Sequence, residues 1–288
     1  FLYSYEKFRK EIELPAVQYS NSDAMERLQK MIRPFVLRRL KKDVLKDLPD
    51  KLEKDMFSPL ESEQKELYEA HTERLRLMLG MQSDAEFRTS KLQILAEITR
   101  LRQICCYPGL VYEGYKGNSS KLEMCMELVQ NAVNGGHKLL LFSQFTTMLD
   151  VLAVRLKKAK ISFYMLTGAT SKEKRAQMVR AFNEDDTSVF CISLKAGGTG
   201  LNLTAADIVI HYDPWWNLAV QNQATDRAHR IGQQNVVSVY KLIAKDTIEE
   251  KILELQEKKA ALLDTISGCE ETRILNMSSE ELLSLLKS

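Results

Sequence analysis

Between residues 121 and 243, short apolar runs alternate with stretches of helical periodicity. The run 138–142 (KLLLF) is apolar after its first residue, which is typical of a strand buried on both faces of a sheet. Strands that alternate with helices over short connections predict a doubly wound parallel α/β sheet with both faces covered. The other predicted strands are 161–166, 189–192, 208–211 and 236–243. A predicted helix, 145–158, separates the first two strands of the region, and another, 170–182, separates the second from the third.

The chain before this region has few strand signals. We expect residues 1–55 to be helical and peripheral, and residues 56–118 to form a helical segment followed by a linker. The sequence SPLE at 58–61 has the spacing of a capping box and predicts the start of a helix. A longer helix is predicted over 84–106, because a Pro-Gly pair follows it closely.

A final long helix is predicted from Thr247, where Glu250 completes another capping box, to the glycine at position 268. Its apolar stripe is broken, so we expect this helix to brace the surface of the lobe. Residues 119–268 are therefore predicted to form one α/β lobe. Residues 269–288 are acidic and rich in leucine, and they predict a short helical tail.

The stretch 189–233 holds the densest set of chemically informative residues. A Gly-Gly-Thr-Gly turn and two adjacent tryptophans precede a predicted helix, on which Gln223, Arg227 and Arg230 are spaced by four and three residues. At about 100° per residue these three side chains fall in one narrow sector. Two fixed guanidinium groups beside a glycine turn suit a polyphosphate. A separate apolar stripe on the same helix is formed by Val220, Ala224, Ala228 and Ile231.

Composition alone excludes few classes of protein. The chain has 288 residues, 44% of them hydrophobic, which is enough for one large domain and a smaller one. Its net charge is +2, so charge alone neither supports nor excludes nucleic acid. No apolar run has the length of a membrane span, and the start of the chain has no signal-peptide pattern. Because the first residue is not Met, we expect an excised part of a longer protein.

The five cysteines form no C-x-x-C pair, and only four histidines accompany them. We therefore predict no zinc site and no other metal site, and thiols that are buried or incidental in a reducing cytosol.

The sequences LKAGGTGLNLTAAD, DPWWN and QATDRAHRIGQ occur in this order within the stretch 189–233. In this respect the chain resembles the second RecA-like lobe of the SNF2 family of superfamily 2 DNA translocases. The resemblance extends from MIRPFVLRRLKKDVLKDLP, which begins at Met31, to about Ser267. It implies a RecA-like fold of the P-loop NTPase type, with an N-terminal helical protrusion and a linker. Three positions depart from the usual family pattern: Tyr107 in place of His, Thr167 in place of Asp and Leu218 in place of Pro.

The segment 33–54 contains eight basic and four acidic residues, a net charge of +4. Such a segment fits a solvated helix face. The resemblance instead implies a place near the ATP cleft for Arg38 and Arg39.

Ligands of open α/β sheets bind beyond the carboxyl ends of the strands. Ser143 and Gln144 follow the KLLLF strand directly, and their polar side chains at a helix start suit a phosphate, with an ordinary N-cap as the alternative. In the family, one side of the glycine motif touches the DNA backbone and the other communicates with the nucleotide. The resemblance thus assigns DNA contacts to Ser193 and Lys195, and nucleotide contacts to the glycines Gly198 and Gly200, with Gln223 placed beside the arginines.

One of the two tryptophans is expected to pack in the core, whereas an exposed indole suits stacking on a base or sugar. By its position in the family motif, Trp216 is the one that faces DNA. Asn217 beside it, and Gly168 in the turn after the second strand of the lobe, complete the predicted DNA-binding set.

The chain has no Gly-Lys and no Asp-Glu dipeptide, so it lacks both the phosphate loop and the acidic Mg²⁺ motif of this superfamily. The resemblance implies that ATP and Mg²⁺ are held mainly by the absent first lobe, with Arg227 and Arg230 reaching across as arginine fingers. The chain alone is therefore predicted to be inactive. The implied function is that of the C-terminal motor lobe of an ATP-dependent translocase on double-stranded DNA, a DNA-dependent ATPase.

The implied partners are double-stranded DNA, the N-terminal RecA-like lobe of the same protein, and DNA-bound proteins that the motor remodels or displaces; no membrane is implied. The implied location is the cytoplasm, on the nucleoid in a bacterium, or the nucleus in a eukaryote. The alternative is a non-catalytic DNA-binding or scaffolding module that keeps the RecA-like fold. Paired arginines at 227 and 230 favour the motor, because a module without catalysis has no need of them.

Overall fold

A computed structural model describes residues 48–80, 84–197 and 200–262, together with the isolated positions 7, 11, 26, 30, 31, 282, 283, 285 and 286. The chain divides into two units, Phe1–Asp47 and Leu48–Ser288, and the architecture below is that of the second. Arg38, Arg39 and Gly198 lie outside the described residues, as do most of the predicted C-terminal tail and Cys269.

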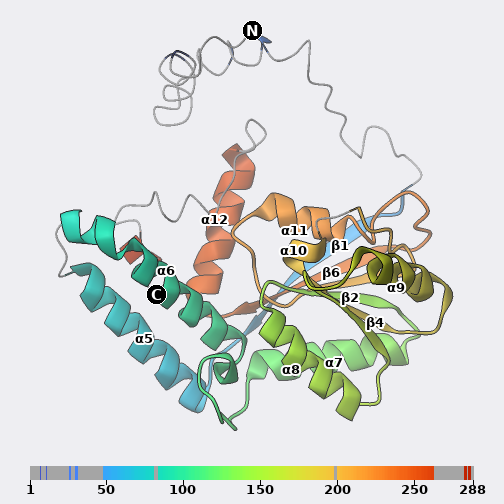
Figure 1. Cartoon of the computed structure of the whole chain (residues 1–288), viewed down its shortest axis with the longest axis horizontal. Helices are drawn as coiled ribbons and strands as arrows, with labels where there is room; N and C mark the ends of the chain where they lie inside the picture. The colour runs from blue at the N-terminus through green and yellow to red at the C-terminus, as the bar shows by residue number, and fades with distance from the viewer. Residues whose placement is uncertain are drawn as a thin grey trace. The chain divides into compact units, whose positions relative to one another are not determined.

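The second unit is built on a six-stranded sheet in which every pair of neighbouring strands is parallel. The strand order is β1-β6-β5-β2-β4-β3 (Figure 1). Because all strands run the same way, all of their carboxyl ends lie at one edge. The strands are β1 (Lys51–Ser58), β2 (Leu139–Ser143), β3 (Phe163–Leu166), β4 (Val189–Ser193), β5 (Ile208–His211) and β6 (Val237–Ala244).

Helices cover both faces of this sheet, so the predicted doubly wound fold is confirmed (Figure 1). Residues of β2 alternate between the two layers: Leu139 and Leu141 pack with α7 and α8, and Leu140 and Phe142 pack with the opposite layer. All five residues of β2 are buried, as the continuous apolar run predicts. One layer contains α7 (Ser120–Asn134) and α8 (Thr146–Lys158), and the other contains α9 (Lys172–Glu184), α10 (Leu194–Gly197) and α11 (Leu218–Thr225).

A third group of helices packs beside the carboxyl edge of the sheet: α5 (Ser62–Gly80), α6 (Asp84–Cys106) and α12 (Ile248–Leu262). They share an apolar core to which Leu75, Leu101 and Ile248 each contribute a fully buried side chain. The helix predicted over 84–106 is confirmed, and the short helix η2 (Pro108–Leu110) follows where the Pro-Gly pair ends it.

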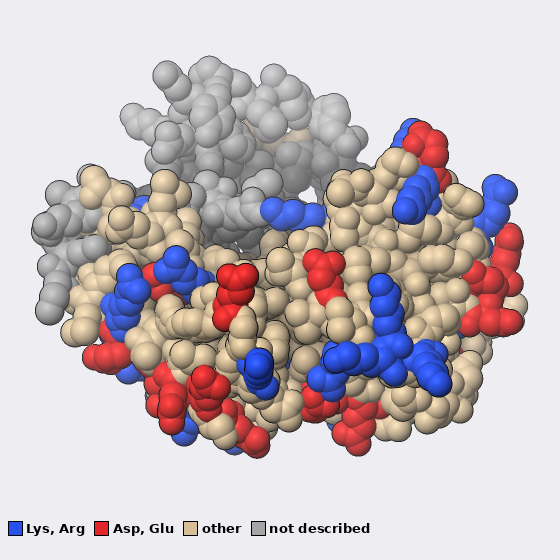
Figure 2. All heavy atoms as spheres, turned by 60° about the horizontal axis from the view of Figure 1, so that its bottom comes forward, with Lys and Arg blue, Asp and Glu red and all other residues tan. Residues whose placement is uncertain are grey.

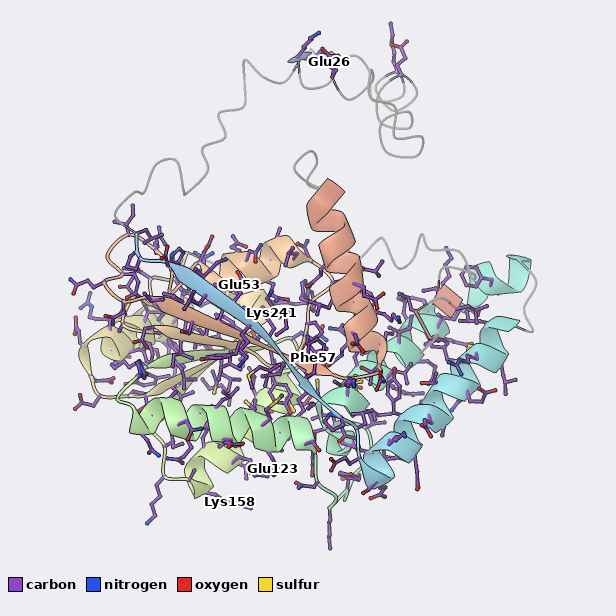
Figure 3. All side chains as sticks on the ribbon, turned by 180° about the vertical axis from the view of Figure 1, so that it is seen from behind. Glu26, Glu53, Phe57, Glu123, Lys158 and Lys241 are labelled. Atoms are coloured by element: carbon purple, nitrogen blue, oxygen red, sulfur yellow. The ribbon has the colours of Figure 1, made fainter. Side chains whose placement is uncertain are left out.

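The prediction that residues 1–55 are helical is wrong for residues 51–55, which belong to β1. This strand pairs with β6 over its whole length, and because side chains alternate along a strand, Lys51, Glu53 and Asp55 lie on one face with Lys241 of β6 (Glu53 and Lys241 are labelled in Figure 3). Lys241 Nζ lies 2.9 Å from Glu53 and 3.6 Å from Asp55. Charged residues are common on edge strands, and here pairing with β6 overrides a helical local pattern.

The predicted helix start at Ser58 is also wrong. Ser58 is the last residue of β1, its carbonyl accepts a hydrogen bond from the Lys245 backbone, and α5 begins at Ser62. At the other end of the lobe, Glu250 does reach back, but to the backbone N–H of Asp246, at 2.8 Å, one residue before Thr247.

A buried ion pair joins the sheet layers to the helical group. Lys121 Nζ of α7 donates to Glu249 Oε2 of α12 at 2.5 Å, and the two side chains are 1% and 0% exposed. The same carboxylate oxygen accepts from the Ala244 backbone N–H at the end of β6. Burial lowers the pKa of Lys121, but the adjacent Glu249 carboxylate more than offsets this, so the pKa is raised and the ammonium stays charged.

We predict that Lys121→Met destabilises the protein by about 3–5 kcal/mol, because it leaves the Glu249 carboxylate buried without a cation. The double variant Lys121→Met/Glu249→Gln should recover most of that loss, since it removes both charges together. Chemical denaturation of the three proteins measures these differences in the free energy of unfolding.

The matched control is the partly exposed pair of Arg155 and Glu123, whose nitrogen and oxygen lie 2.7 Å apart. Arg155→Met should cost at most about 1 kcal/mol, as is usual for exposed pairs. A loss in Lys121→Met no larger than in Arg155→Met contradicts the prediction.

Candidate functional site

The residues predicted to contact a ligand gather at the carboxyl edge of the sheet. Ser143 ends β2 and lies opposite Ser193, which ends β4, and both side chains are buried. Asp213 follows β5 by two residues and is also buried. The turn after β3 brings an exposed Gly168 to the same edge.

Ser143 organises the loop after β2 from inside the protein. Its Oγ donates to Asp213 Oδ1 at 2.5 Å and accepts from the Phe145 backbone N–H at 3.1 Å. The Gln144 backbone N–H donates to the same Asp213 oxygen at 3.3 Å. Within this pair of predicted DNA contacts, Ser143 therefore holds the loop, and the half-buried Gln144 side chain is the one nearer the surface.

A residue that the sequence analysis did not single out completes this cluster. Arg102 comes from α6, is 5% exposed, and donates from Nη1 to Gln144 Oε1 at 2.9 Å and from Nη2 to the Pro214 carbonyl at 2.6 Å. Its Nη2 also lies 3.9 Å from Asp213 Oδ2. The available signal in the sequence is an arginine in the apolar last turns of a helix, between Leu101 and the isoleucine at position 104.

Asp213 and Arg102 are both buried, and each stabilises the charged form of the other. Burial raises the pKa of Asp213 to about 6, while the Arg102 guanidinium and the Ser143 hydrogen bond hold it lower than burial alone would. Burial lowers the pKa of Arg102, and the Asp213 carboxylate offsets this shift in part. Neither group is stable here without the other.

Both tryptophans are half-buried and lie on either side of the cluster. Trp215 packs against the core of the layer that contains α9 and α11, and Trp216 packs against the helical group. The Trp215 backbone N–H donates to Gln221 Oε1 at 3.2 Å. Asn217 is the N-cap of α11, because its Oδ1 accepts from the Val220 backbone N–H at 3.1 Å.

The glycine turn follows β4 through the short helix α10. At Gly197 a Cβ atom would lie 3.1 Å from the Phe142 ring, so a glycine permits this close packing. Gly200 is exposed and has a positive φ of +32°. Lys195 is exposed on α10, which contacts α11.

The predicted helix through both arginines is corrected, because α11 ends at Thr225. Arg227 and Arg230 lie in the turns that follow, so helical spacing does not place them. The predicted apolar stripe also ends early, since Ala228 is buried but Ile231 is 71% exposed.

Arg227 is anchored whereas Arg230 is exposed. Arg227 is 7% exposed, its Nε donates to the Gly197 carbonyl at 3.1 Å, and its own carbonyl accepts from the Leu203 backbone N–H. Burial lowers the pKa of Arg227, and the neighbouring Arg230 cation lowers it further, so the two charges interact across the turn. Gln223 is exposed on α11.

A second residue that the sequence analysis missed is Gln233, the last residue of the RIGQ sequence. It is buried, and its Nε2 donates to the carbonyls of Ala206 at 2.8 Å and of Thr204 and Ala228 at 3.2 Å. Its Oε1 accepts from the backbone N–H groups of the two following residues, at 2.9 Å each. This side chain closes the turn that carries Arg230.

Four cysteines, Cys105, Cys106, Cys125 and Cys191, are free and buried, as expected. Within the described ranges, no three histidine, cysteine, aspartate or glutamate side chains are grouped so that they could hold a metal ion. No helix in the same ranges is long and apolar enough to cross a membrane.

Two family models match this chain. The helicase conserved C-terminal domain matches residues 120–232, and the SNF2-related domain matches residues 1–110. The putative ATP-dependent helicase/translocase YwqA of Bacillus subtilis is 40% identical over 301 aligned residues, which cover 99% of this chain and 32% of that protein. The chain spans about a quarter to a third of the length of the first curated relatives it matches.

Solved structures from Sulfolobus solfataricus have the same fold. The SWI2/SNF2 ATPase core in complex with dsDNA has a TM-score of 0.70 at 33% identity, covering 99% of this chain and 60% of that one. The SWI2/SNF2 ATPase C-terminal domain has a TM-score of 0.68 at 31% identity, covering 83% of this chain and 99% of that one. The all-parallel sheet, the sequence matches and these structures together show that the chain belongs to the SNF2 family of ATP-dependent helicases and carries its RecA-like C-terminal domain.

Proposed function

We propose that this chain is the second motor lobe of an ATP-dependent translocase on double-stranded DNA, and that the motor remodels or displaces DNA-bound proteins. The observation that carries the proposal is the pairing of an anchored Arg227 with an exposed Arg230 beside the glycine turn. Support for DNA comes from the structural neighbour with dsDNA, whose match covers 99% of this chain.

On the nucleotide side, Arg230 is proposed to meet the phosphoryl group in transit, and Arg227 to hold the glycine turn that presents it. A planar guanidinium can pair with two phosphate oxygens at once, which an ammonium cannot. Gln223, Gly198 and Gly200 are proposed to line the same nucleotide contact. No group of three histidine, cysteine, aspartate or glutamate side chains in the described ranges could hold a metal ion, and we assign Mg²⁺ and the β- and γ-phosphates to a first lobe.

On the DNA side, the proposed contacts are to the backbone, which carries most of the affinity and no sequence information. Lys195 supplies a charge, and Trp216 an aromatic surface at the loop after β5. The other proposed DNA-contacting residues are Ser143, Gln144, Gly168, Ser193 and Asn217. Ser143 and Ser193 are buried, so their proposed part is to hold the loops that meet DNA, as Ser143 does through Asp213. Asn217 likewise holds its own loop as the N-cap of α11.

Arg230→Lys tests the nucleotide side in a two-lobe motor that contains this chain. DNA-stimulated ATP hydrolysis should fall by on the order of 10³-fold, the lower end of what an arginine finger supplies. Folding should not change, because Arg230 is exposed. Steady-state ATPase at saturating DNA, alongside a melting curve, measures both.

Arg180→Lys is the matched control, since Arg180 is exposed and lies on α9, which carries none of the proposed site residues. It should keep full turnover. Full turnover in Arg230→Lys as well, or a loss that follows its melting temperature, contradicts the finger assignment.

A change at Lys195 tests whether this side chain contacts a DNA phosphate or only adds to the net charge of the protein. Lys195→Ala should reduce the slope of log Kobs against log salt concentration by about 0.9, the amount for one phosphate contact on B-DNA. Fluorescence anisotropy on duplexes of unrelated sequence measures the slopes. Equal slopes for Lys195→Ala and the unmodified protein contradict the prediction.

Lys158→Ala is the control for this measurement. Lys158 is the exposed last residue of α8 (Figure 3). The face drawn in Figure 2 carries both basic and acidic side chains. Lys158 lies outside the proposed site, so its removal should leave the slope unchanged.

A further inference from the structure

Arg102 makes contacts that its place on α6 does not by itself explain. We propose that it is a positioning residue, which sets the loop 213–217 after β5 against the loop 143–145 after β2. The helical group thereby fixes the place of Trp216 and Gln144 on the DNA side. This inference rests on the proposed function, and it adds a residue from outside the matched helicase C-terminal domain.

One planar guanidinium group, that of Arg102, bonds to two loops. Arg102 Nη1 donates to Gln144 Oε1 at 2.9 Å, and Nη2 donates to the Pro214 carbonyl at 2.6 Å. The two acceptors belong to loops that follow different strands. Because both donors belong to one rigid guanidinium, the loops cannot separate without breaking one of the bonds. A lysine carries its donors on one nitrogen at the end of a flexible stem, so it does not fix the spacing between the two loops.

Arg102 also interacts electrostatically with Asp213. Asp213 Oδ2 lies 3.9 Å from Arg102 Nη2, and Asp213 also accepts from the Ser143 hydroxyl and the Gln144 backbone. Arg102 therefore neutralises the carboxylate that holds the loop after β2 in place. Both charged groups are buried, so loss of either leaves an uncompensated charge.

Three aromatic rings surround the Arg102 guanidinium. Its Cζ lies 5.5 Å from the centroid of the Trp216 ring, 5.9 Å from that of Trp215 and 5.7 Å from that of Phe145. Cations at such distances from aromatic rings are attracted to them. Gln256 of α12 adds a second tie from the helical group, since its Nε2 donates to the Trp215 carbonyl. The loop that presents Trp216 is thus held from α6 and α12.

Intrinsic fluorescence tests the positioning directly and needs neither DNA nor ATP. The chain has two tryptophans, and both lie in this loop, so all tryptophan emission of the 288-residue chain reports on it. Arg102→Lys should shift the emission to longer wavelength and increase quenching by acrylamide. Arg100→Lys is the matched control, because Arg100 lies on the same helix, is half-exposed and pairs with Glu97. Wild-type emission and quenching in Arg102→Lys overturn the inference.

A variant that fails to fold does not end the test. Arg102→Met/Asp213→Asn removes both buried charges together, so no lone charge is left inside the protein. The double variant lacks the guanidinium fork, while the amide that replaces the carboxylate at position 213 keeps an oxygen that can accept from the Ser143 hydroxyl. It should show the same fluorescence shift with a near-native melting temperature. A folded double variant with wild-type fluorescence overturns the inference.

The functional arm uses the two-lobe motor that contains this chain. Arg102→Lys should lower DNA-stimulated turnover by roughly 10²-fold, the cost of misplacing a functional group by about 1 Å. If unmodified protein shows no DNA stimulation, the proposed function itself fails. If it does, and Arg102→Lys retains full stimulation, the motor assignment stands and only the positioning inference is overturned.

Discussion

The parallel register of the sheet is the constraint on which the rest of this structure depends. It brings the ends of β2, β4 and β5 to one edge, and with them the buried polar groups Ser143, Ser193 and Asp213. A carboxylate at that depth requires a cation and hydrogen-bond donors. Arg102 and the loop after β2 supply both, so the architecture of the edge follows from satisfying one buried charge.

The same requirement ties the helical group to the sheet. Lys121 and Glu249 form a second buried pair between α7 and the start of α12, and the Tyr212 ring lies next to the ammonium. The anchored Arg227 forms a third link, between the turn after α11 and the glycine turn after β4. Each link joins segments that are distant in sequence.

The sequence predicts those elements that are determined by residues close together in the chain, and it fails for those that depend on distant residues. The buried run that became β2 and the helix that ends before Pro108 were predicted because apolar periodicity and proline act locally. Strand β1 was not, since Glu53 and Asp55 reach Lys241 only when β1 pairs with β6. The arginine positions were predicted, but on a helix that ends at Thr225. Arg102 was missed because its partners lie 42 and 112 residues away in the chain.

The central claim is that this chain moves along double-stranded DNA as half of an ATP-driven motor. Displacement of a third strand from a DNA triplex tests this most directly, because it requires translocation and no separation of the duplex. A two-lobe protein containing this chain should release the third strand with ATP and not with a non-hydrolysable analogue, and should leave the duplex paired. Tight binding to the triplex without ATP-dependent release would contradict the claim and favour a DNA-binding scaffold that keeps the fold.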